Sequence, residues 1–254
     1  MDDAYRDTVR RFREKSAAGV LHGMRSGHGQ LAAMGVIAAS GIDYLYLDQQ
    51  HGLVTPLQTS EITTALKPYG ITILVRVPTN DPVSIGIVID AGVHGVIVPD
   101  IATEDDARRL VASTLYPPTG RRSWGSIVFG EPGYGGGDPR TIIPLCLPMI
   151  ETAAGVTNAE AIASVPGIDA LYVGRNDLAL DLVIDVREAQ TSPVLKAAVQ
   201  KVRVVCDAHG IPMATTGDPA LLRAEGYRML TIGSDLDMIA RGIRTMLAYG
   251  GNDG

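Results

Sequence analysis

The sequence predicts an α/β protein of the (β/α)8 TIM-barrel class, with one domain over residues 1–254. Short apolar runs rich in β-branched residues recur, and each is followed by a turn and a helical pattern. The runs are almost continuously apolar, as in parallel strands that are buried on both faces. Eight such units within 254 residues match this barrel. The alternative, a doubly wound open sheet, needs a switch point and usually has fewer strands.

The elements follow from these patterns in chain order. We expect strands at residues 18–22, 44–48, 72–77, 95–99, 145–151, 170–174, 211–216 and 229–233. We expect helices at about 3–16, 28–40, 56–67, 82–91, 103–113, 153–164, 188–209, 218–225 and 235–248. Helix-start chemistry supports three of them, because Thr55, Asp81 and Thr103 can each cap the helix that follows. Gly92 and Gly210 are typical helix ends.

One segment, at about 116–144, departs from this rhythm. It is too long and too rich in Gly and Pro for an ordinary connection, and such loops are usually functional or mobile. Its "GYGGGDP" stretch lacks the order of a phosphate-binding loop. We therefore expect a flexible or lid-like loop, without a second domain. The long 188–209 helix could serve an interface.

Composition narrows the function classes. The net charge of −6 and the pI near 5.3 argue against a nucleic-acid partner, which would require a basic surface. No apolar run is long enough to span a membrane, and the charged start of the chain predicts no secretory signal. Two cysteines cannot form a disulfide framework. We expect a cytoplasmic protein with small-molecule partners.

Two carboxylates are the candidate metal ligands. Barrel active sites lie at the C-terminal ends of the strands, and Glu151 and Asp177 follow strands of adjacent units. Carboxylates that approach closely must share a proton or bind a cation, and this pair suits Mg²⁺ or Mn²⁺ better than zinc. The alternative is a surface Glu and a helix-capping Asp.

Two further side chains at the predicted strand ends could act on a substrate. Arg76 lies in an apolar strand, where it needs a carboxylate partner or an anionic substrate. His51 could be a hydrogen-bonded core histidine, or a general base oriented by Asp48 or Asp90. A Schiff-base mechanism is not expected, because every lysine falls in a predicted helix: Lys15, Lys67, Lys196 and Lys201.

Six motifs in order carry a family resemblance over residues 18–246. They are "YLYLDQQHG", "VRVPTNDP", "DAGVHGVIVP", "YPPTGRRSWG", "PMIET" and "VGRNDLALDL". The chain resembles the HpcH/HpaI family of class II, metal-dependent pyruvate aldolases. It is similar to the aldolases of 4-hydroxy-2-oxo-heptanedioate and of 2-keto-3-deoxy sugar acids, which serve aromatic or sugar-acid catabolism. The resemblance implies a (β/α)8 barrel, a hexamer built as a trimer of dimers, and a last helix exchanged between subunits.

The resemblance also implies roles for the candidate residues. Glu151 and Asp177 would hold a divalent cation (Mg²⁺, Mn²⁺ or Co²⁺) that the 2-oxo and carboxylate oxygens of the substrate chelate. Arg76 would stabilise the enolate oxygen, and His51 would be the acid/base residue.

Other roles implied by the resemblance are supporting ones. Asp90 would assist His51, partly across a subunit boundary, and Asp48 would act at the site through water. Backbone amides near Gly174 and Asn176 would bind the pyruvate carboxylate.

Three positions depart from the family pattern. Gln50 stands where well-known members carry Glu, Met149 where they carry Gln, and Arg175 with Asn176 where they carry Pro and a small residue. We expect Gln50 and Arg175 to bind substrate. The additional cation at Arg175 would favour an acidic acceptor, or a more anionic donor such as oxaloacetate.

The predicted function is that of a lyase. It would reversibly cleave a 4-hydroxy-2-oxo acid to pyruvate, or a related 2-oxo acid such as hydroxypyruvate, plus an aldehyde, through a metal-stabilised enolate. One alternative is a metal-dependent oxaloacetate decarboxylase or a synthase that uses the same enolate. Another is a non-catalytic binding protein that retains the barrel.

Overall fold

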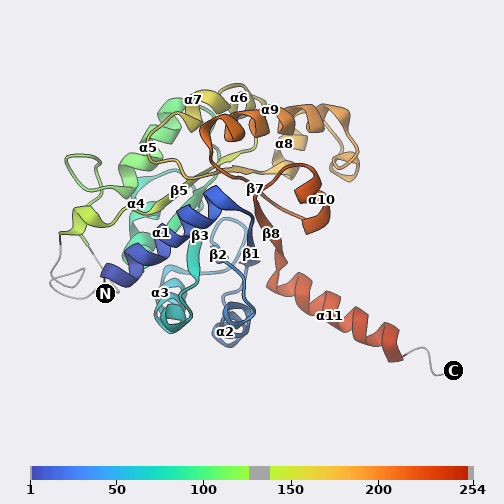
Figure 1. The fold of residues 1–254 in the computed structure, drawn as a ribbon, viewed down its shortest axis with the longest axis horizontal. Helices are drawn as coiled ribbons and strands as arrows, with labels where there is room; N and C mark the ends of the chain where they lie inside the picture. Colours follow the sequence, from blue (N-terminus) through green and yellow to red (C-terminus); the bar gives the residue numbers. More distant parts are fainter. Residues whose placement is uncertain (1, 126–137, 251–254) are drawn as a thin grey trace.

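Eight parallel strands close on themselves in chain order in a computed structural model that describes residues 2–125 and 138–250 (Figure 1). The predicted TIM barrel is therefore confirmed. The strands are β1 (Leu21–Ser26), β2 (Tyr44–Asp48), β3 (Thr72–Arg76), β4 (Gly95–Val98), β5 (Leu145–Ile150), β6 (Leu171–Val173), β7 (Met213–Thr216) and β8 (Met229–Ser234).

Helices precede, link and follow the strands, and those that link strands cover the outside of the barrel (Figure 1). They are α1 (Asp2–Ala18), α2 (Leu31–Ala39), α3 (Pro56–Leu66), α4 (Pro82–Asp90), α5 (Glu104–Thr114), α6 (Ala153–Thr157), α7 (Ala159–Ala163), α8 (Arg175–Asp181), α9 (Pro193–His209), α10 (Pro219–Ala224) and α11 (Asp235–Gly250). Short 3-10 helices are η1 (Lys67–Tyr69), η3 (Pro139–Thr141) and η4 (Val186–Glu188).

The predicted capping chemistry is present at the helix starts. Thr55 and Thr103 form capping boxes with Gln58 and Asp106, and Asp81 accepts hydrogen bonds from the first turn of α4. Each cap satisfies amides that have no partner inside the helix. Local sequence therefore fixes where α3, α4 and α5 begin.

The structure departs from the expected elements in several places. The first strand runs over Leu21–Ser26 and not 18–22, because polar residues continue it to the mouth of the barrel. The segment 153–164 is two helices joined at Asn158, whose side chain bonds the carbonyl of Ala102 at 2.7 Å. Helix α8 was not expected, because its seven residues are too few to show a clear helical period.

Two apolar layers arise from the alternation of side chains along the strands. Outward residues such as Leu45 and Ile73 pack under the helices, in one buried cluster. Inward residues such as Tyr44, Leu74 and Leu147 fill the barrel, in a second cluster. The interior is therefore a packed core, and a ligand can bind only at its ends.

Helix α1 closes the barrel at the N-terminal ends of the strands. Its Tyr5, Val9 and Phe12 belong to the inner cluster, and the Tyr5 hydroxyl donates to the Val93 carbonyl at 3.1 Å. Arg13 of the same helix is paired with Asp169 at 2.7 Å. This end of the barrel is thus plugged by apolar packing and held by ion pairs.

The predicted long loop, 116–144, connects α5 to β5 at the end of the barrel where the strands begin. In its described part, the amides of Arg121 and Arg122 donate to carbonyls at the end of α5, at 2.7 and 2.9 Å. Most of "GYGGGDP" lies outside the described residues. The described part of the loop is therefore anchored away from the C-terminal ends of the strands.

Helix α11 leaves the barrel after β8 and projects away from it (Figure 1). It exposes large apolar side chains, whose exposed fractions lie between 53% and 75%: Leu236, Ile239, Ile243, Met246, Leu247 and Tyr249. Their spacing places most of them on one face of the helix. An apolar face of this size on one chain is typical of a protein–protein contact.

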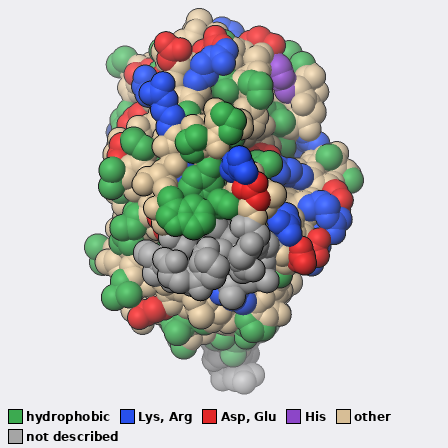
Figure 2. Space-filling model, turned by 90° about the vertical axis from the view of Figure 1, so that its left-hand side faces the viewer, with side chains coloured by type: hydrophobic (Ala, Val, Ile, Leu, Met, Phe, Trp, Pro, Cys, Tyr) green, Lys and Arg blue, Asp and Glu red, His purple; other side chains and the backbone are tan. Residues whose placement is uncertain are grey.

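Charges on the molecular surface are mixed. On the face drawn in Figure 2, basic and acidic side chains alternate with apolar ones among the coloured residues, without a continuous basic stripe. None of the helices in the described ranges combines the length and apolar character that a bilayer crossing requires.

Candidate active site

The alternation of inward and outward side chains along the strands also places polar side chains at the mouth, the end of the barrel formed by the C-terminal ends of the strands. Along β2, Tyr44 and Tyr46 point inward and Asp48 takes the next inward position. By the same parity Arg76 follows Leu74 in β3, and Glu151 follows Met149 of β5. Because the strands are parallel, these ends meet on one side of the barrel. The polar residues predicted at the strand ends are thus neighbours.

Arg76 and Asp48 form a buried two-pronged pair. The Nε and Nη2 atoms of Arg76 donate to the two carboxylate oxygens of Asp48 at 2.9 and 2.5 Å. The backbone amides of Gln50 and His51 also donate to Asp48, at 3.1 and 3.3 Å. Burial opposes ionisation of Asp48, but these bonds outweigh it and hold its pKa below the ordinary value. Asp48 therefore fixes the orientation of Arg76.

Glu151 is held where a cation could be bound. Its Oε1 accepts a hydrogen bond from the Asp100 amide at 2.8 Å, and Asp100 itself has a positive φ of 56°. A Cβ on Gly174 would lie 2.5 Å from Oε2, so only glycine lets this carboxylate lie against β6. Burial raises the pKa of Glu151, and the charges of Asp100 and Asp177 add to that effect. A bound cation would remove this penalty.

Asp177 lies in the first turn of α8, directly after β6. No side chain caps this helix, because its N-cap residue is Gly174. The first-turn amides, including that of Asn176, are therefore available to an anion such as a carboxylate. The expectation that Gly174 and Asn176 bind a carboxylate remains a prediction.

The carboxylate pair fits a hard divalent cation. No group of three or more His, Cys, Asp or Glu side chains within the described ranges could hold a metal ion. Mg²⁺ is commonly bound through one or two carboxylates, with water and substrate oxygens completing its shell. The glycine cradle beside Glu151 and the raised pKa of this carboxyl group agree with such a site.

His51 and Asp90 do not meet within one chain. His51 is exposed in the turn after β2. Asp90 is the last residue of α4, at the opposite end of the barrel, where it binds Arg122 at 2.6 Å. Burial raises the pKa of Asp90, and Arg122 opposes that rise. Their cooperation across a subunit boundary remains a prediction.

The two departures from the family pattern at the mouth differ in their surroundings. Arg175 is paired with Glu225 of the segment after α10, so its charge is already compensated. The amide oxygen of Gln50 is buried without a hydrogen-bond partner among the described residues. A substrate that donates a hydrogen bond would satisfy Gln50.

Sequence reasoning missed Arg25, the inward residue near the end of β1. It lines a cavity of about 290 Å³ at the mouth together with Arg76, Arg175 and Asp177. Below them, the hydroxyls of Tyr44, Tyr172 and Thr231 form a hydrogen-bonded floor at 2.8 and 3.0 Å. The expectation that the first strand ends at residue 22 hid Arg25. Continued alternation from Leu21 through Gly23 could have revealed it.

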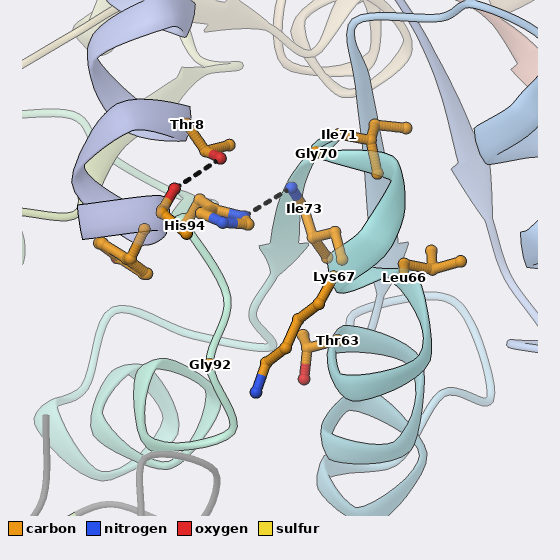
Figure 3. A pocket seen from close by; sticks show the side chains of 11 residues that line it. Thr8, Thr63, Leu66, Lys67, Gly70, Ile71, Ile73, Gly92 and His94 are labelled. Atoms are coloured by element: carbon orange, nitrogen blue, oxygen red, sulfur yellow. Dashed lines mark hydrogen bonds between the residues drawn. The ribbon is translucent and has the colours of Figure 1, made fainter. Parts of the chain in front are cut away.

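A smaller cavity, of about 110 Å³, lies at the other end of the barrel (Figure 3). The side chain of His94 faces it, and its Nδ1 accepts a hydrogen bond from the Ile73 amide at 3.0 Å. Burial lowers the pKa of His94 to about 4, so the ring is neutral and satisfied. No carboxylate is among the residues that line this cavity.

The fold and the mouth are those of a barrel enzyme. Two carboxylates suited to a divalent cation, Glu151 and Asp177, lie at the same end of the barrel as Arg76, which Asp48 holds in place. A profile of the HpcH/HpaI aldolase/citrate lyase family matches residues 26–241. The chain therefore belongs to this family, as the sequence predicts.

Individual relatives agree with the family. The chain is 31% identical over 220 residues to the hydroxypyruvate/pyruvate aldolase of Rhizorhabdus wittichii, covering 84% of this chain and 86% of that protein. It is 31% identical to the 5-keto-4-deoxy-D-glucarate aldolase of Salmonella arizonae, over 83% and 84% of the two chains. A crystal structure of a family protein from Burkholderia cenocepacia superposes with a TM-score of 0.86, at 26% identity and 96% and 98% coverage. The predicted enzyme class, a carbon–carbon lyase of the class II aldolase kind, is confirmed.

Proposed function

We propose that this chain reversibly cleaves a 4-hydroxy-2-oxo acid to pyruvate, or a related 2-oxo acid such as hydroxypyruvate, and an aldehyde. The observation that carries the proposal is the placement of Glu151 in its glycine cradle, with Asp177 on the adjacent unit and Arg76 fixed by Asp48. Aldol cleavage needs a group that accepts negative charge at the 2-oxo oxygen, and this mouth offers one.

Glu151 and Asp177 would hold a divalent cation such as Mg²⁺, Mn²⁺ or Co²⁺, which the family generally requires. The cation would supply Lewis-acid activation of the 2-oxo group. Arg76 places a fixed guanidinium at the mouth, where it stabilises the oxyanion that develops as the C3–C4 bond breaks. The uncapped amides of α8 orient the substrate carboxylate.

His51 is the proposed base for the proton of the C4 hydroxyl. It lies in the turn whose amides bind Asp48, so the same carboxylate that fixes Arg76 also holds the backbone of this turn. Asp90 of a neighbouring subunit would complete the acid/base pair. In an isolated chain His51 is exposed, so full acid/base activity should require the assembled protein.

Metal removal is the direct test. The purified protein is treated with a chelator, and pyruvate release from a 4-hydroxy-2-oxo acid is followed before and after addition of Mg²⁺, Mn²⁺ or Co²⁺. Activity should disappear and return with the metal. Full activity after rigorous chelation would refute the proposal.

Oxaloacetate decarboxylation is a second candidate, and the exposure of His51 within one chain favours considering it. Decarboxylation forms an enolate without removing a hydroxyl proton. His51→Ala should therefore abolish aldol cleavage and spare decarboxylation. Equal loss of both activities would argue that His51 supports the site in another way.

We propose a hexamer built as a trimer of dimers, with α11 exchanged between subunits. The exposed apolar face of α11 and its projection from the barrel support this assembly (Figure 1). Ile243→Glu combined with Leu247→Glu should shift the protein to a smaller species in light scattering. A cytoplasmic setting is consistent with two free, buried cysteines, Cys146 and Cys206.

A further inference from the structure

Arg25 is an arginine in the mouth that the proposed reaction does not use. It stands opposite Tyr46 in the β1–β2 register, on the inward side of the strand. The pairing of β1 with β8 shifts between Gly23 and Arg25, and such irregularities often redirect a side chain at an active site. Arg25 lines the mouth cavity and keeps 37% of its side chain exposed.

The guanidinium of Arg25 lacks a committed partner. Its Nη1 is 3.7 Å from Asp48 Oδ2, beyond hydrogen-bond distance, and both oxygens of Asp48 already bind Arg76. The Nε of Arg25 is buried without a hydrogen-bond partner in the part of the chain that the structure describes. The nearby Asp237 carboxylate binds the amide and hydroxyl of Ser234, at 3.0 and 2.8 Å. A buried donor without a partner is costly, which indicates a ligand-binding role.

The other arginines of the cavity are neutralised within the chain. Arg76 is paired with Asp48, and Arg175 with Glu225. The additional cation that the sequence suggested at Arg175 is therefore supplied by Arg25.

The position of Arg25 shows which part of a substrate it could touch. Glu151 directly follows β5. In the closed strand order β1, which carries Arg25, lies four strands from β5, on the opposite side of the barrel. A 2-oxo acid bound near Glu151 and Asp177 has its oxo-acid end on that side of the mouth. A group at Arg25 consequently belongs to the other end of the substrate, which becomes the aldehyde.

We propose that Arg25 binds a second carboxylate, on the aldehyde half of the substrate, and so selects dicarboxylate substrates over neutral ones. This inference rests on the proposed function. The guanidinium can form two parallel hydrogen bonds to a carboxylate. Binding would also give the unpartnered donor of Arg25 a partner, provided that the side chain turns toward the ligand.

The test compares two aldehydes of similar length in pyruvate addition by the Mg²⁺-loaded, full-length protein. Succinic semialdehyde ends in a carboxylate, and pentanal is neutral. The natural chain should prefer succinic semialdehyde, and Arg25→Met should lower kcat/KM for it by about 10- to 100-fold, mainly through KM. The value for pentanal should stay within about twofold, and Arg25→Lys should retain part of the preference. Arg11→Met, at the closed end of the barrel, should leave kcat/KM for both aldehydes unchanged.

Equal losses with both aldehydes, or no loss with either, would overturn the proposal. Absence of turnover with every aldehyde would instead refute the proposed function, and binding then decides the role of Arg25. In calorimetry with Mg²⁺, Arg25→Met should weaken the binding of 2-oxoheptanedioate about 10-fold and leave the binding of 2-oxoheptanoate unchanged. Equal effects on these two acids would exclude a carboxylate site at Arg25, whatever the reaction.

Discussion

The two ends of the barrel treat polar side chains in opposite ways. At the closed end, Arg13 is paired with Asp169, Lys15 with Asp43, and the neutral ring of His94 accepts a hydrogen bond from the backbone. At the mouth, the Nε of Arg25 and the amide oxygen of Gln50 are buried without a partner among the described residues. These three groups of the closed end have partners within the chain, whereas the two named atoms of the mouth have none among the described residues.

This difference shows how one fold separates stability from chemistry. A buried polar group is tolerated when it is satisfied and is costly when it is not. Two features of the mouth carry such a cost in free energy. The buried carboxyl group of Glu151 has a raised pKa, and Asp100 has a positive φ. Substitution of a group that carries this cost, such as Glu151, should therefore affect activity more than folding, and substitutions at the closed end should do the reverse.

The largest effect is expected for Glu151→Gln. Removing a proposed cation ligand should lower metal-dependent turnover on the order of 10³-fold, since a bound cation would contribute several kcal/mol to the transition state. The thermal midpoint should not fall, because a buried carboxylate whose pKa is raised is removed. Glu61→Gln, on the exposed side of α3, is the matched control. A large fall in the midpoint would contradict the proposed separation.

Asp48→Asn should affect both turnover and stability. Turnover should fall about 100-fold, because Arg76 loses the partner that orients it. The free energy of unfolding should fall by about 3 kcal/mol, since a buried ion pair is broken on one side. Kinetics and denaturant titration measure the two effects.

The double variant Asp48→Asn with Arg76→Met sharpens this prediction. It removes the unpaired charge and should recover most of the lost stability while turnover remains low. Recovery of turnover would show that the pair is not part of the catalytic machinery.

At the closed end, His94→Phe should lower the free energy of unfolding by about 1 to 3 kcal/mol, because the Ile73 amide loses its acceptor. Turnover should stay within about twofold. Denaturant titration and the aldol assay check the two expectations. A larger loss of turnover would mean that the two ends are coupled.

The same histidine predicts a dependence of stability on pH. The folded pKa of about 4 lies below the ordinary value of 6.5, so the unfolded chain binds the proton more tightly. The full contribution of neutral His94 is present above pH 6.5 and is lost as the pH falls toward 4, by up to about 3 kcal/mol. Over this pH range the free energy of unfolding of His94→Phe should fall less than that of the natural chain.

The smallest effect is expected for Lys15→Met, which removes an ion pair between α1 and Asp43. The Lys15 side chain is more than half exposed, and such pairs contribute roughly 0.5 kcal/mol. The denaturation midpoint should shift little, and less still in high salt. A loss above about 2 kcal/mol would show that α1 depends on this pair more than on its apolar contacts.

Particular residues show how much of the site could be predicted from the sequence. The apolar run at 44–48 predicted β2 with its exact bounds, and its alternation placed Asp48 at the mouth. Arg76 and Glu151 were found in the same way. The two-pronged bond between Asp48 and Arg76 could not be predicted, because it joins side chains 28 positions apart. Arg25 was missed because polar residues concealed the end of β1.

The sequence by itself determined the barrel, the family and most residues of the mouth, because strand and helix periods and capping are local properties of the chain. Only the tertiary structure decided which charges are neutralised. It paired Arg175 with Glu225, Asp90 with Arg122 and Asp48 with Arg76, and it left Arg25 facing the cavity. Ion pairing depends on distances of a few ångströms between residues far apart in the chain, and closing the barrel sets those distances.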